Sequence, residues 1–260
     1  MQPMLTIAVR AARSAGDYIM RNLNKAHDLQ VQEKGQYDFV TEVDRHAEEL
    51  IIETLLKSFP DHGIIAEESG NQNEQAEFQW IIDPLDGTTN FLHGFPHFAV
   101  SIACQQNNRL EHAVIYDPFK QELFCASRGD GATVNNRRMR VSKVRSSAGT
   151  LLGTGFPFRN RDKLENWLGM FNEFFKTAAD VRRAGAAALD LAYVADGRLD
   201  GFWEFGLQPW DIAAGALLIR EAGGLIGDFQ GNENYLSSGD VVAANPKLFA
   251  EMVRKIQPYV

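Results

Sequence analysis

Two aspartates at the end of an apolar run are the residues that first suggest chemistry in this sequence. In the stretch WIIDPLDGTTNF, residues 80–91, Asp83 and Asp86 follow three apolar residues and precede Gly-Thr-Thr. A turn or a helix cap would account for one of these aspartates but not for both. Two carboxylates ~4 Å apart repel by about 4 kcal/mol at an effective dielectric constant of about 20, and a bound cation removes that cost. The spacing therefore favours a cation site.

The residues after the aspartates favour a bound anion. Gly87 permits a sharp turn, and we expect Thr88 to cap a helix that continues through Thr89 and Asn90. The free N–H groups of Gly87 and Thr88 would then bind an anion, most naturally a phosphate. Carboxylates for a cation beside amides for an anion suit a metal-bridged phosphate ester.

Three further acids lie where strands or helices are predicted to end or begin. Glu67 follows the apolar strand 64–66, and two successive strands that end at one sheet edge would bring it beside Asp83. Asp211 opens a helix in PWDIAAGALL and Asp44 lies in FVTEVD, and each taken singly is better explained as a helix N-cap. Together the acids favour a metal, and their oxygen ligands favour Mg²⁺, Mn²⁺ or Ca²⁺ over zinc or copper.

Two competing chemistries fit the spacing less well. Phosphatases that form an aspartyl-phosphate use Asp-x-Asp-x-Thr, whereas Asp83 and Asp86 are three residues apart. Direct attack by a metal-activated water is therefore favoured. Among the histidines only His93 and His97 have the spacing of a zinc-binding helix, and Pro96 between them argues against that helix.

The composition narrows the function classes. The chain has 260 residues and a formal net charge of −8, which disfavours non-specific binding to nucleic acid or to an anionic membrane. We find no nucleic-acid motif and no stretch near the roughly 18 apolar residues of a membrane span. The basic run at 137–145 is interpreted as a solvated turn and strand edge. Cys104 and Cys125 are expected to be inert core residues, and a cytoplasmic location is the default expectation.

Hydrophobic periodicity predicts the elements that position these residues. Apolar residues at steps of three and four indicate helices, and short apolar runs between turn residues indicate strands. The predicted order is a helix at 3–23, a loop or irregular hairpin at 24–40, a helix at 41–59, strands at 64–66 and 79–82 around a polar loop at 70–77, an antiparallel meander at 95–145, helices at about 161–177 and 185–196, a strand at 201–205 and a helix at about 210–223. This order predicts a layered α+β sandwich with a hinge at 141–150.

Three motifs together resemble a known family. GIIAEES, WIIDPLDGTTNF and PWDIAAGALLIREAGG are similar to the inositol monophosphatase family of Mg²⁺-dependent, lithium-sensitive sugar phosphatases. The likeness runs from about residue 1 to 250, and TGFPF, YDPFKQELF and AALDLAYVADGRLDGFWE are similar to its bacterial SuhB-type members. The resemblance implies one domain over residues 1–260, an α-β-α-β-α sandwich with packed halves of about 1–145 (α+β) and 146–260 (α/β), and a homodimer.

The resemblance also implies roles for the acids. Glu67, Asp83 and the backbone carbonyl of Leu85 would hold a first Mg²⁺. Asp83, Asp86 and Asp211 would hold a second, and a third, weaker Mg²⁺ would lie near Glu67. The catalytic residues would be Glu67 and Thr88, which orient the attacking water, with Asp44 supporting the Thr88 hydroxyl group.

The remaining implied roles concern the substrate. The substrate-binding residues would be Asp86, Gly87, Thr88, Arg183, Gly185, Ala186, Ala187, Glu204 and Asp211. Family members often have a small polar residue where this chain has Ala186. The implied reaction is hydrolysis of myo-inositol 1-phosphate or a similar sugar phosphate, with inhibition by lithium. The alternatives are fructose-1,6-bisphosphatase or 3′-phosphoadenosine phosphatase activity, and a SuhB-type role as a protein partner of the transcription machinery in ribosomal RNA antitermination.

Overall fold

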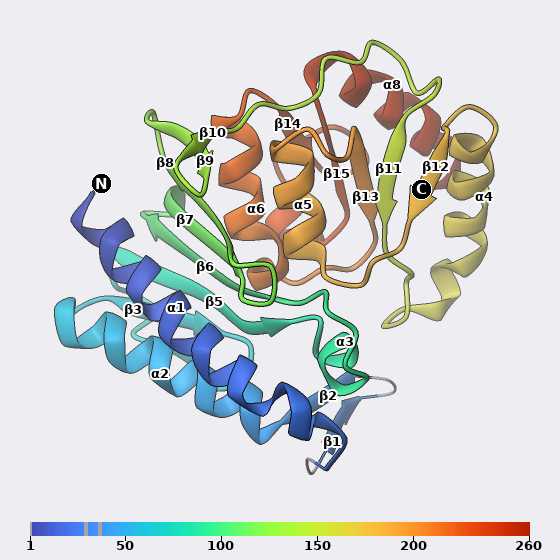
Figure 1. The fold of residues 1–260 in the computed structure, drawn as a ribbon. Coiled ribbons are helices and arrows are strands. Elements are labelled where there is room, and N and C mark those ends of the chain that lie inside the picture. The colour runs from blue at the N-terminus through green and yellow to red at the C-terminus, as the bar shows by residue number, and fades with distance from the viewer. Residues whose placement is uncertain (1, 29–30, 36–37) are drawn as a thin grey trace.

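The computed structural model describes residues 2–28, 31–35 and 38–260, and in it helices and sheets alternate in layers (Figure 1). Helices α1 (Pro3–Asn22) and α2 (Glu42–Ser58) pack together on the outer face of the larger sheet. Helices α5 (Ala187–Ala195) and α6 (Pro209–Glu221) lie between the two sheets, and α4 (Leu164–Phe175) and α8 (Pro246–Ile256) lie on the far side of the smaller one. The predicted α-β-α-β-α sandwich is confirmed.

The larger sheet has eight strands in the order β10-β9-β8-β7-β6-β5-β3-β4. Its strands are β3 (Gly63–Ala66), β4 (Gly70–Gln72), β5 (Phe78–Asp86), β6 (Ala99–Gln106), β7 (Arg109–Asp117), β8 (Glu122–Ser127), β9 (Gly131–Val134) and β10 (Arg137–Arg138). Strands β6 to β10 form the antiparallel meander that was predicted at 95–145. Strand β5 pairs with β6 in antiparallel and with β3 in parallel. The loop predicted at 70–77 was wrong in part, because β4 pairs with β3 there.

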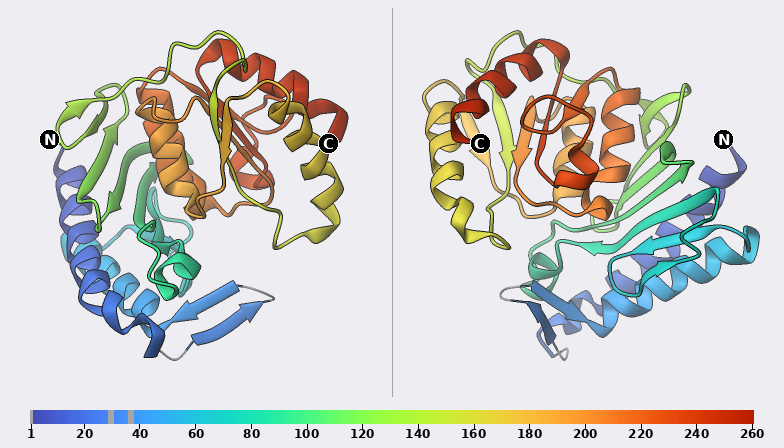
Figure 2. Two further views of the ribbon diagram at one scale, coloured as in Figure 1. Left: turned by 45° about the vertical axis from the view of Figure 1, so that its right-hand side comes forward. Right: turned by 180° about the vertical axis from the view of Figure 1, so that it is seen from behind.

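The smaller sheet has five strands in the order β12-β11-β13-β15-β14. Its strands are β11 (Leu151–Thr154), β12 (Asp180–Arg182), β13 (Gly201–Glu204), β14 (Leu225–Gly227) and β15 (Val241–Ala244). The remaining elements are η1 (Leu23–Asp28), β1 (Val31–Gly35), β2 (Asp38–Thr41), α3 (Thr88–Leu92), η2 (Arg161–Lys163), α7 (Tyr235–Ser238) and η3 (Gln257–Tyr259). Figure 2 shows the β1–β2 hairpin close to α3.

The first two helices begin and pack as their sequences predict. The apolar residues of α1 form one buried stripe, and Gly16 within it lets Tyr116 of the sheet approach, since a Cβ there would lie 2.6 Å from the Tyr116 ring. Helix α2 begins after Thr41, whose side chain accepts a hydrogen bond from Val43 N, while Asp44 completes a capping box. These contacts fix both helices on the sheet that carries the acidic motif.

The structure also tests the predictions for the two cysteines and for membrane-spanning helices. Cys104 and Cys125 are buried and not in a disulfide, and burial raises the pKa of each thiol to about 12, as expected for inert core residues. None of the helices in the described part of the chain is long and apolar enough to cross a membrane.

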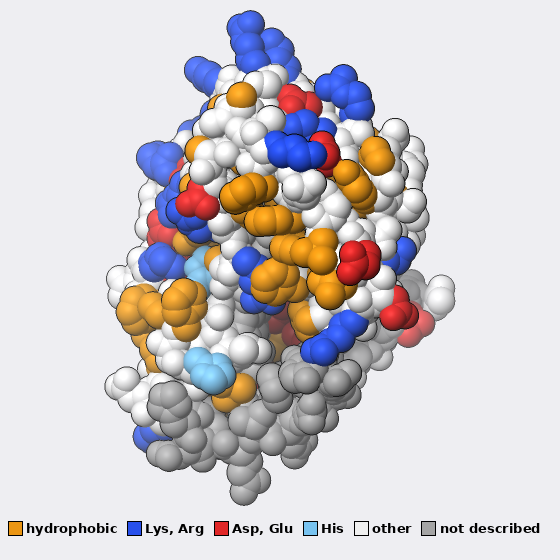
Figure 3. All heavy atoms as spheres, turned by 90° about the vertical axis from the view of Figure 1, so that its right-hand side faces the viewer, with side chains coloured by type: hydrophobic (Ala, Val, Ile, Leu, Met, Phe, Trp, Pro, Cys, Tyr) orange, Lys and Arg blue, Asp and Glu red, His pale blue; other side chains and the backbone are white. Residues whose placement is uncertain are grey.

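One face of the molecule exposes a group of apolar side chains. Figure 3 shows hydrophobic side chains gathered on the side that carries α4. The large exposed members on and just before this helix are Phe156, Leu164, Leu168 and Phe175. The rings of Trp167, Phe171 and Phe175 stack along it at centroid distances of 5.2 and 5.5 Å. We call Phe156, Leu164, Leu168 and Phe175 the α4 patch.

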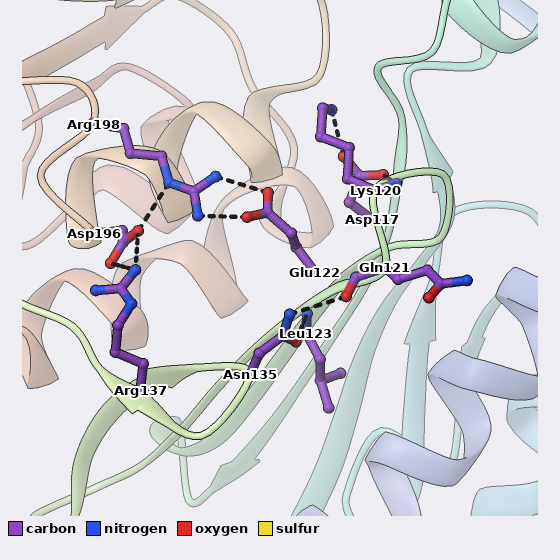
Figure 4. A network of polar contacts seen from close by, with 9 residues as sticks. All are labelled: Asp117, Lys120, Gln121, Glu122, Leu123, Asn135, Arg137, Asp196 and Arg198. Carbon is purple, nitrogen blue, oxygen red and sulfur yellow. Dashed lines mark hydrogen bonds and ion pairs between the residues drawn. The ribbon is translucent and has the colours of Figure 1, made fainter.

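An ion-pair network joins the meander to the segment after α5 (Figure 4). Arg198 donates to both carboxylate oxygens of Glu122 and to Asp196, and Asp196 also accepts from Arg137 at 2.8 Å. Arg137 lies in the edge strand β10, so the predicted solvated strand edge is confirmed there.

Candidate active site

The parallel pairing of β3 with β5 brings two of the predicted acids to one sheet edge. Ala66 pairs with Ile82, and Glu67 N donates to the carbonyl oxygen of Ile82 at 3.2 Å. Glu67 therefore lies level with Asp83, the next residue of β5. Both residues line the same cavity, as the order of the two strands led us to expect.

A β-bulge aims both aspartates of the motif to one side. The strand was predicted to end at Ile82, but β5 continues to Asp86. Asp83 pairs with Ser101 and Asp86 with Ala99, so the bulged strand holds one extra residue between them. Ser101 and Ala99 are two apart and share a face of β6, and their partners therefore share a face too. Without the bulge, residues three apart would point to opposite faces.

The third acid of the cluster, Asp211, lies in helix α6 between the two sheets. Asp211 is the third residue of α6, and its carboxylate accepts a hydrogen bond from Gln208 N at 2.8 Å. Gln208 is the N-cap, so the interpretation of Asp211 itself as the N-cap was wrong by three positions. Oxygens of Asp83, Asp86 and Asp211 lie within 4.8 Å of one another. Arg159, which the sequence did not indicate, has Nη1 3.6 Å from Asp211 Oδ2.

Burial and mutual repulsion make this carboxylate cluster costly by itself. Burial and then the Glu67 charge raise the pKa of Asp83 well above its usual value. Burial and then the Asp211 charge raise the pKa of Asp86, although Ala188 N donates to Asp86 at 2.7 Å. A divalent cation between the carboxylates would offset both effects. The donor set therefore fits a hard cation such as Mg²⁺.

The position of Thr88 in the structure differs from the helix cap that was predicted. The N-cap of α3 is Gly87, in a left-handed conformation with φ of 94°, and Thr88 is the first helical residue. The prediction that Thr88 caps the helix was therefore wrong. Its hydroxyl group instead lies 2.9 Å from Asp44 Oδ1 and 3.1 Å from the Leu85 carbonyl oxygen. Asp44, interpreted singly as an N-cap, is the capping-box partner of Thr41 and holds Thr88 from behind the cavity.

A cavity of about 290 Å³ lies in front of these groups. It is lined by all the predicted metal and substrate residues, which are Glu67, Asp83, Leu85, Asp86, Gly87, Thr88, Arg183, Gly185, Ala186, Ala187, Glu204 and Asp211. Asn90 connects α3 to the segment before α5, because its side-chain amide donates a hydrogen bond to the Ala184 carbonyl oxygen at 2.9 Å. The cavity also contains Asp190, which the sequence analysis did not single out because it lies within an alanine- and leucine-rich helix.

The comparisons with known proteins agree with this geometry. The model of the inositol monophosphatase family matches residues 1–260. The chain belongs to the inositol monophosphatase family. It is 57% identical over 265 residues to the Nus factor SuhB of Pseudomonas aeruginosa, covering 100% of this chain and 98% of that protein.

Solved structures of the inositol monophosphatase family have the same fold. The extragenic suppressor protein SuhB of Bartonella henselae superposes with a TM-score of 0.96 at 41% identity, covering 100% of both chains. The inositol monophosphatase of Anabaena (Nostoc) superposes with a TM-score of 0.88 at 38% identity, covering 98% of this chain and 95% of that one. Membership makes this chain one of a family of metal-dependent phosphatases, and its acidic cluster is the place where a metal could bind.

Proposed function

We propose that this protein hydrolyses myo-inositol 1-phosphate, or a similar sugar phosphate, with Mg²⁺. The observation that carries the proposal is the convergence of Asp83, Asp86 and Asp211 within 4.8 Å at one wall of the cavity. The cavity is also lined by Arg183 and Glu204, which suit the alcohol part of a sugar phosphate. The site thus combines carboxylates for a cation with polar groups for a polyol.

The family resemblance implies two sets of oxygen donors. Glu67, Asp83 and the Leu85 carbonyl would hold one Mg²⁺, and Asp83, Asp86 and Asp211 a second. A third, weaker ion would lie near Glu67. The Leu85 carbonyl oxygen lies 3.1 Å from Thr88 Oγ1 and has two lone pairs, so it could bind a cation. Bound Mg²⁺ supplies Lewis acidity toward the phosphate and lowers the pKa of a bound water.

The protein groups position the water and the phosphate. Thr88 turns its hydroxyl hydrogen toward Asp44, so its oxygen remains able to accept a hydrogen bond from the attacking water. Glu67 would orient that water from the adjacent strand end. The backbone amides of Gly87 and Thr88, at the start of α3, would donate to the phosphate oxygens. These residues would contribute by positioning the water and by binding the negatively charged phosphate.

The substrate alcohol would lie against Arg183, Glu204 and the segment before α5, which all line the cavity. The segment Gly185, Ala186 and Ala187 leads into α5 and lines the cavity with backbone groups. Arg183 lies with its guanidinium over the ring of Phe156, 4.9 Å from the centroid, which fixes a cation at the rim. Glu204 is 6% exposed and is the predicted acceptor for a sugar hydroxyl group.

Phosphate release from myo-inositol 1-phosphate, with and without Mg²⁺, tests the proposal. Wild type is compared with Asp83→Asn, which removes the carboxylate shared by both metal sets, and with Asp17→Asn on the exposed side of α1 as the control. We expect Mg²⁺-dependent release that is lost only in Asp83→Asn. Near-normal release by folded Asp83→Asn would contradict the metal assignment. Fructose 1,6-bisphosphate and 3′-phosphoadenosine phosphates in the same panel, and a lithium titration, identify the substrate class.

We also propose a second function, as a protein partner of the transcription machinery. The support is the 57% identity, along the whole chain, to a relative named Nus factor SuhB. We propose the basic run at 137–145 and the adjacent residues Arg182 and Arg183 as the contact points; of these, Arg137 pairs with Asp196 and Arg183 lines the cavity. Ribosomal RNA synthesis in a strain that depends on this chain separates the functions. Support by Asp83→Asn would make the role independent of catalysis, and its loss would tie the two together.

The chain is further proposed to form a homodimer, as the family resemblance implies. The α4 patch supports this, since Leu168 and Phe175 are 42% and 67% exposed although they are large and apolar. Apolar groups of this size on one face are more typical of an interface than of a monomer surface. A two-fold dimer would bury the same patch on both copies.

A further inference from the structure

The cavity holds a buried acid that none of the roles above uses. Asp190 lies in the first turn of α5, is 2% exposed, and lines the cavity together with Glu204. Within the described part of the chain, no donor forms a hydrogen bond with the carboxylate of Asp190 or Glu204. A buried carboxylate without a donor is costly, so its donor is expected from outside the chain.

The aspartates of the metal cluster differ from Asp190 in this respect. Asp83 accepts from Leu85 N at 2.9 Å, Asp86 from Ala188 N at 2.7 Å and Asp211 from Gln208 N at 2.8 Å. Backbone groups thus fix the three acids that would hold metal. Asp190 and Glu204 are left with acceptor oxygens for a ligand.

Two glycines on one strand face make the space for these acceptors. A Cβ at Gly155 would lie 1.9 Å from Glu204 Oε1, and one at Gly153 would lie 3.7 Å from Asp190 Cγ. Gly153 of β11 pairs with Phe202 of the parallel strand β13. Two residues further along both strands the side chains point to the same face again, so Gly155 lies beside Glu204. The two carboxylates therefore lie next to one another between β11, β13 and α5. Any larger residue at 155 would fill the place of the Glu204 carboxylate.

Charge also links the pair. Burial raises the pKa of both Asp190 and Glu204, Asp190 adds to the effect on Glu204, and the Arg183 charge opposes it at both residues. Arg183 is thus the cation that faces both acids, and its own place is fixed against Phe156. Two acceptors beside one cation form a polar wall for a ligand with several hydroxyl groups.

We propose that Asp190 is a specificity-determining residue that accepts a hydrogen bond from a substrate hydroxyl group next to the one that Glu204 accepts. The inference rests on the proposed phosphatase function and names the substrate class, phosphate esters of polyols. Such a substrate supplies donors to both carboxylates. An ester whose alcohol has no hydroxyl groups leaves both buried acceptors unpaired, and the site discriminates against it for that reason.

The test compares myo-inositol 1-phosphate with cyclohexyl phosphate, which has the same ring size and no hydroxyl groups. The value of kcat/KM is measured for both esters with wild type, Asp190→Leu and Asp190→Asn. Leucine removes the acceptor at similar volume, and asparagine keeps the shape with one acceptor fewer. Asp17→Leu, on the exposed side of α1, is the control. Thermal melting reports whether each variant is folded.

We expect Asp190→Leu to lower the preference for the inositol ester over the cyclohexyl ester by about tenfold, the factor that one hydrogen bond provides. Asp190→Asn should lower it by less, and Asp17→Leu should leave it as in wild type. An unchanged preference in a folded Asp190 variant overturns the inference while the phosphatase stands, because a merely structural role of Asp190 would reduce both esters alike. If wild type hydrolyses neither ester, the proposed function fails and this inference fails with it.

Discussion

The hydroxyl group of Thr88 lies 2.9 Å from Asp44 Oδ1, although 44 residues separate the two along the chain. The other carboxylate oxygen of Asp44 accepts from Thr41 N at 2.9 Å and from Thr41 Oγ1 at 2.6 Å. The capping box of α2 therefore also fixes the hydroxyl group at the cavity. One local feature stabilises a helix and orients a residue predicted to be catalytic.

This relationship predicts that Asp44→Asn and Thr88→Ala have similar effects. The asparagine amide can turn a donor toward Thr88 and reverse the hydroxyl hydrogen, and alanine removes the hydroxyl group. We expect each to lower kcat by about 100-fold, the size of effect typical of a misplaced reacting group, with little change in KM. Thr88→Ser should keep most activity. Steady-state kinetics check this, and wild-type kcat in Thr88→Ala would contradict the role of the hydroxyl group.

The raised pKa values of Asp83 and Asp86 predict how Mg²⁺ and pH act together on stability. An acid with a folded-state pKa above its unfolded value of about 3.9 stabilises the folded protein at low pH, and that contribution is lost as pH rises through the folded pKa. Under the proposed function, Mg²⁺ binds the ionised carboxylates and offsets their repulsion. The melting temperature should therefore rise more on adding Mg²⁺ at about pH 8 than at about pH 5.

Melting curves of wild type and Asp83→Asn, each with and without Mg²⁺, measure this effect. The variant lacks one of the repelling carboxylates, so its metal-free form should be less sensitive to rising pH and its gain from Mg²⁺ should be small. An equal gain at both pH values in wild type would show that the carboxylates are ionised at the lower pH even without metal.

Local patterns in the sequence predicted the layers and the acids of the cavity, whereas the substrate-binding residues were implied by the family resemblance. The periodicity of α1 and the short apolar runs of the meander can each be recognised within about ten residues. The order of β3 and β5 then implied that Glu67 and Asp83 meet, and they line one cavity. The acids themselves stood out because each follows or precedes a predicted element.

The missed features depend on residues distant in sequence. The bulge between Asp83 and Asp86 is defined only by pairing with β6, and the strand predicted at 79–82 ended before it. Asp190 lies in an apolar helix, and only the fold places it beside Glu204 and Gly153. Likewise Arg159 comes from a loop with no helical or strand pattern. Local sequence shows which residue types are present, but not which face they share.

The network around Arg198 predicts a modest contribution to stability across the two halves that we propose, residues 1–145 and 146–260. Arg198 bonds Glu122 of β8 in the first half and Asp196 in the second. Arg198→Ala should lower the free energy of unfolding by about 1 kcal/mol, the upper range for surface ion pairs. Arg220→Ala, which breaks a pair with Glu233 within the second half, is the control. Urea unfolding measures the free energy of unfolding of both variants. An equal decrease in the two would show that the Arg198 network, which joins the two halves, stabilises the protein no more than an ion pair within one half.

The α4 patch predicts that one substitution dissociates the proposed homodimer. Leu168 is 42% exposed on α4, and glutamate there would place like charges opposite each other in a two-fold interface that buries this patch on both copies. Leu168→Glu should therefore be monomeric in sedimentation velocity at a protein concentration where wild type is dimeric. Leu225→Glu is the matched control, since Leu225 is 43% exposed in β14, outside the patch. A dimer that survives Leu168→Glu but dissociates with Leu225→Glu would place the interface elsewhere on the molecule.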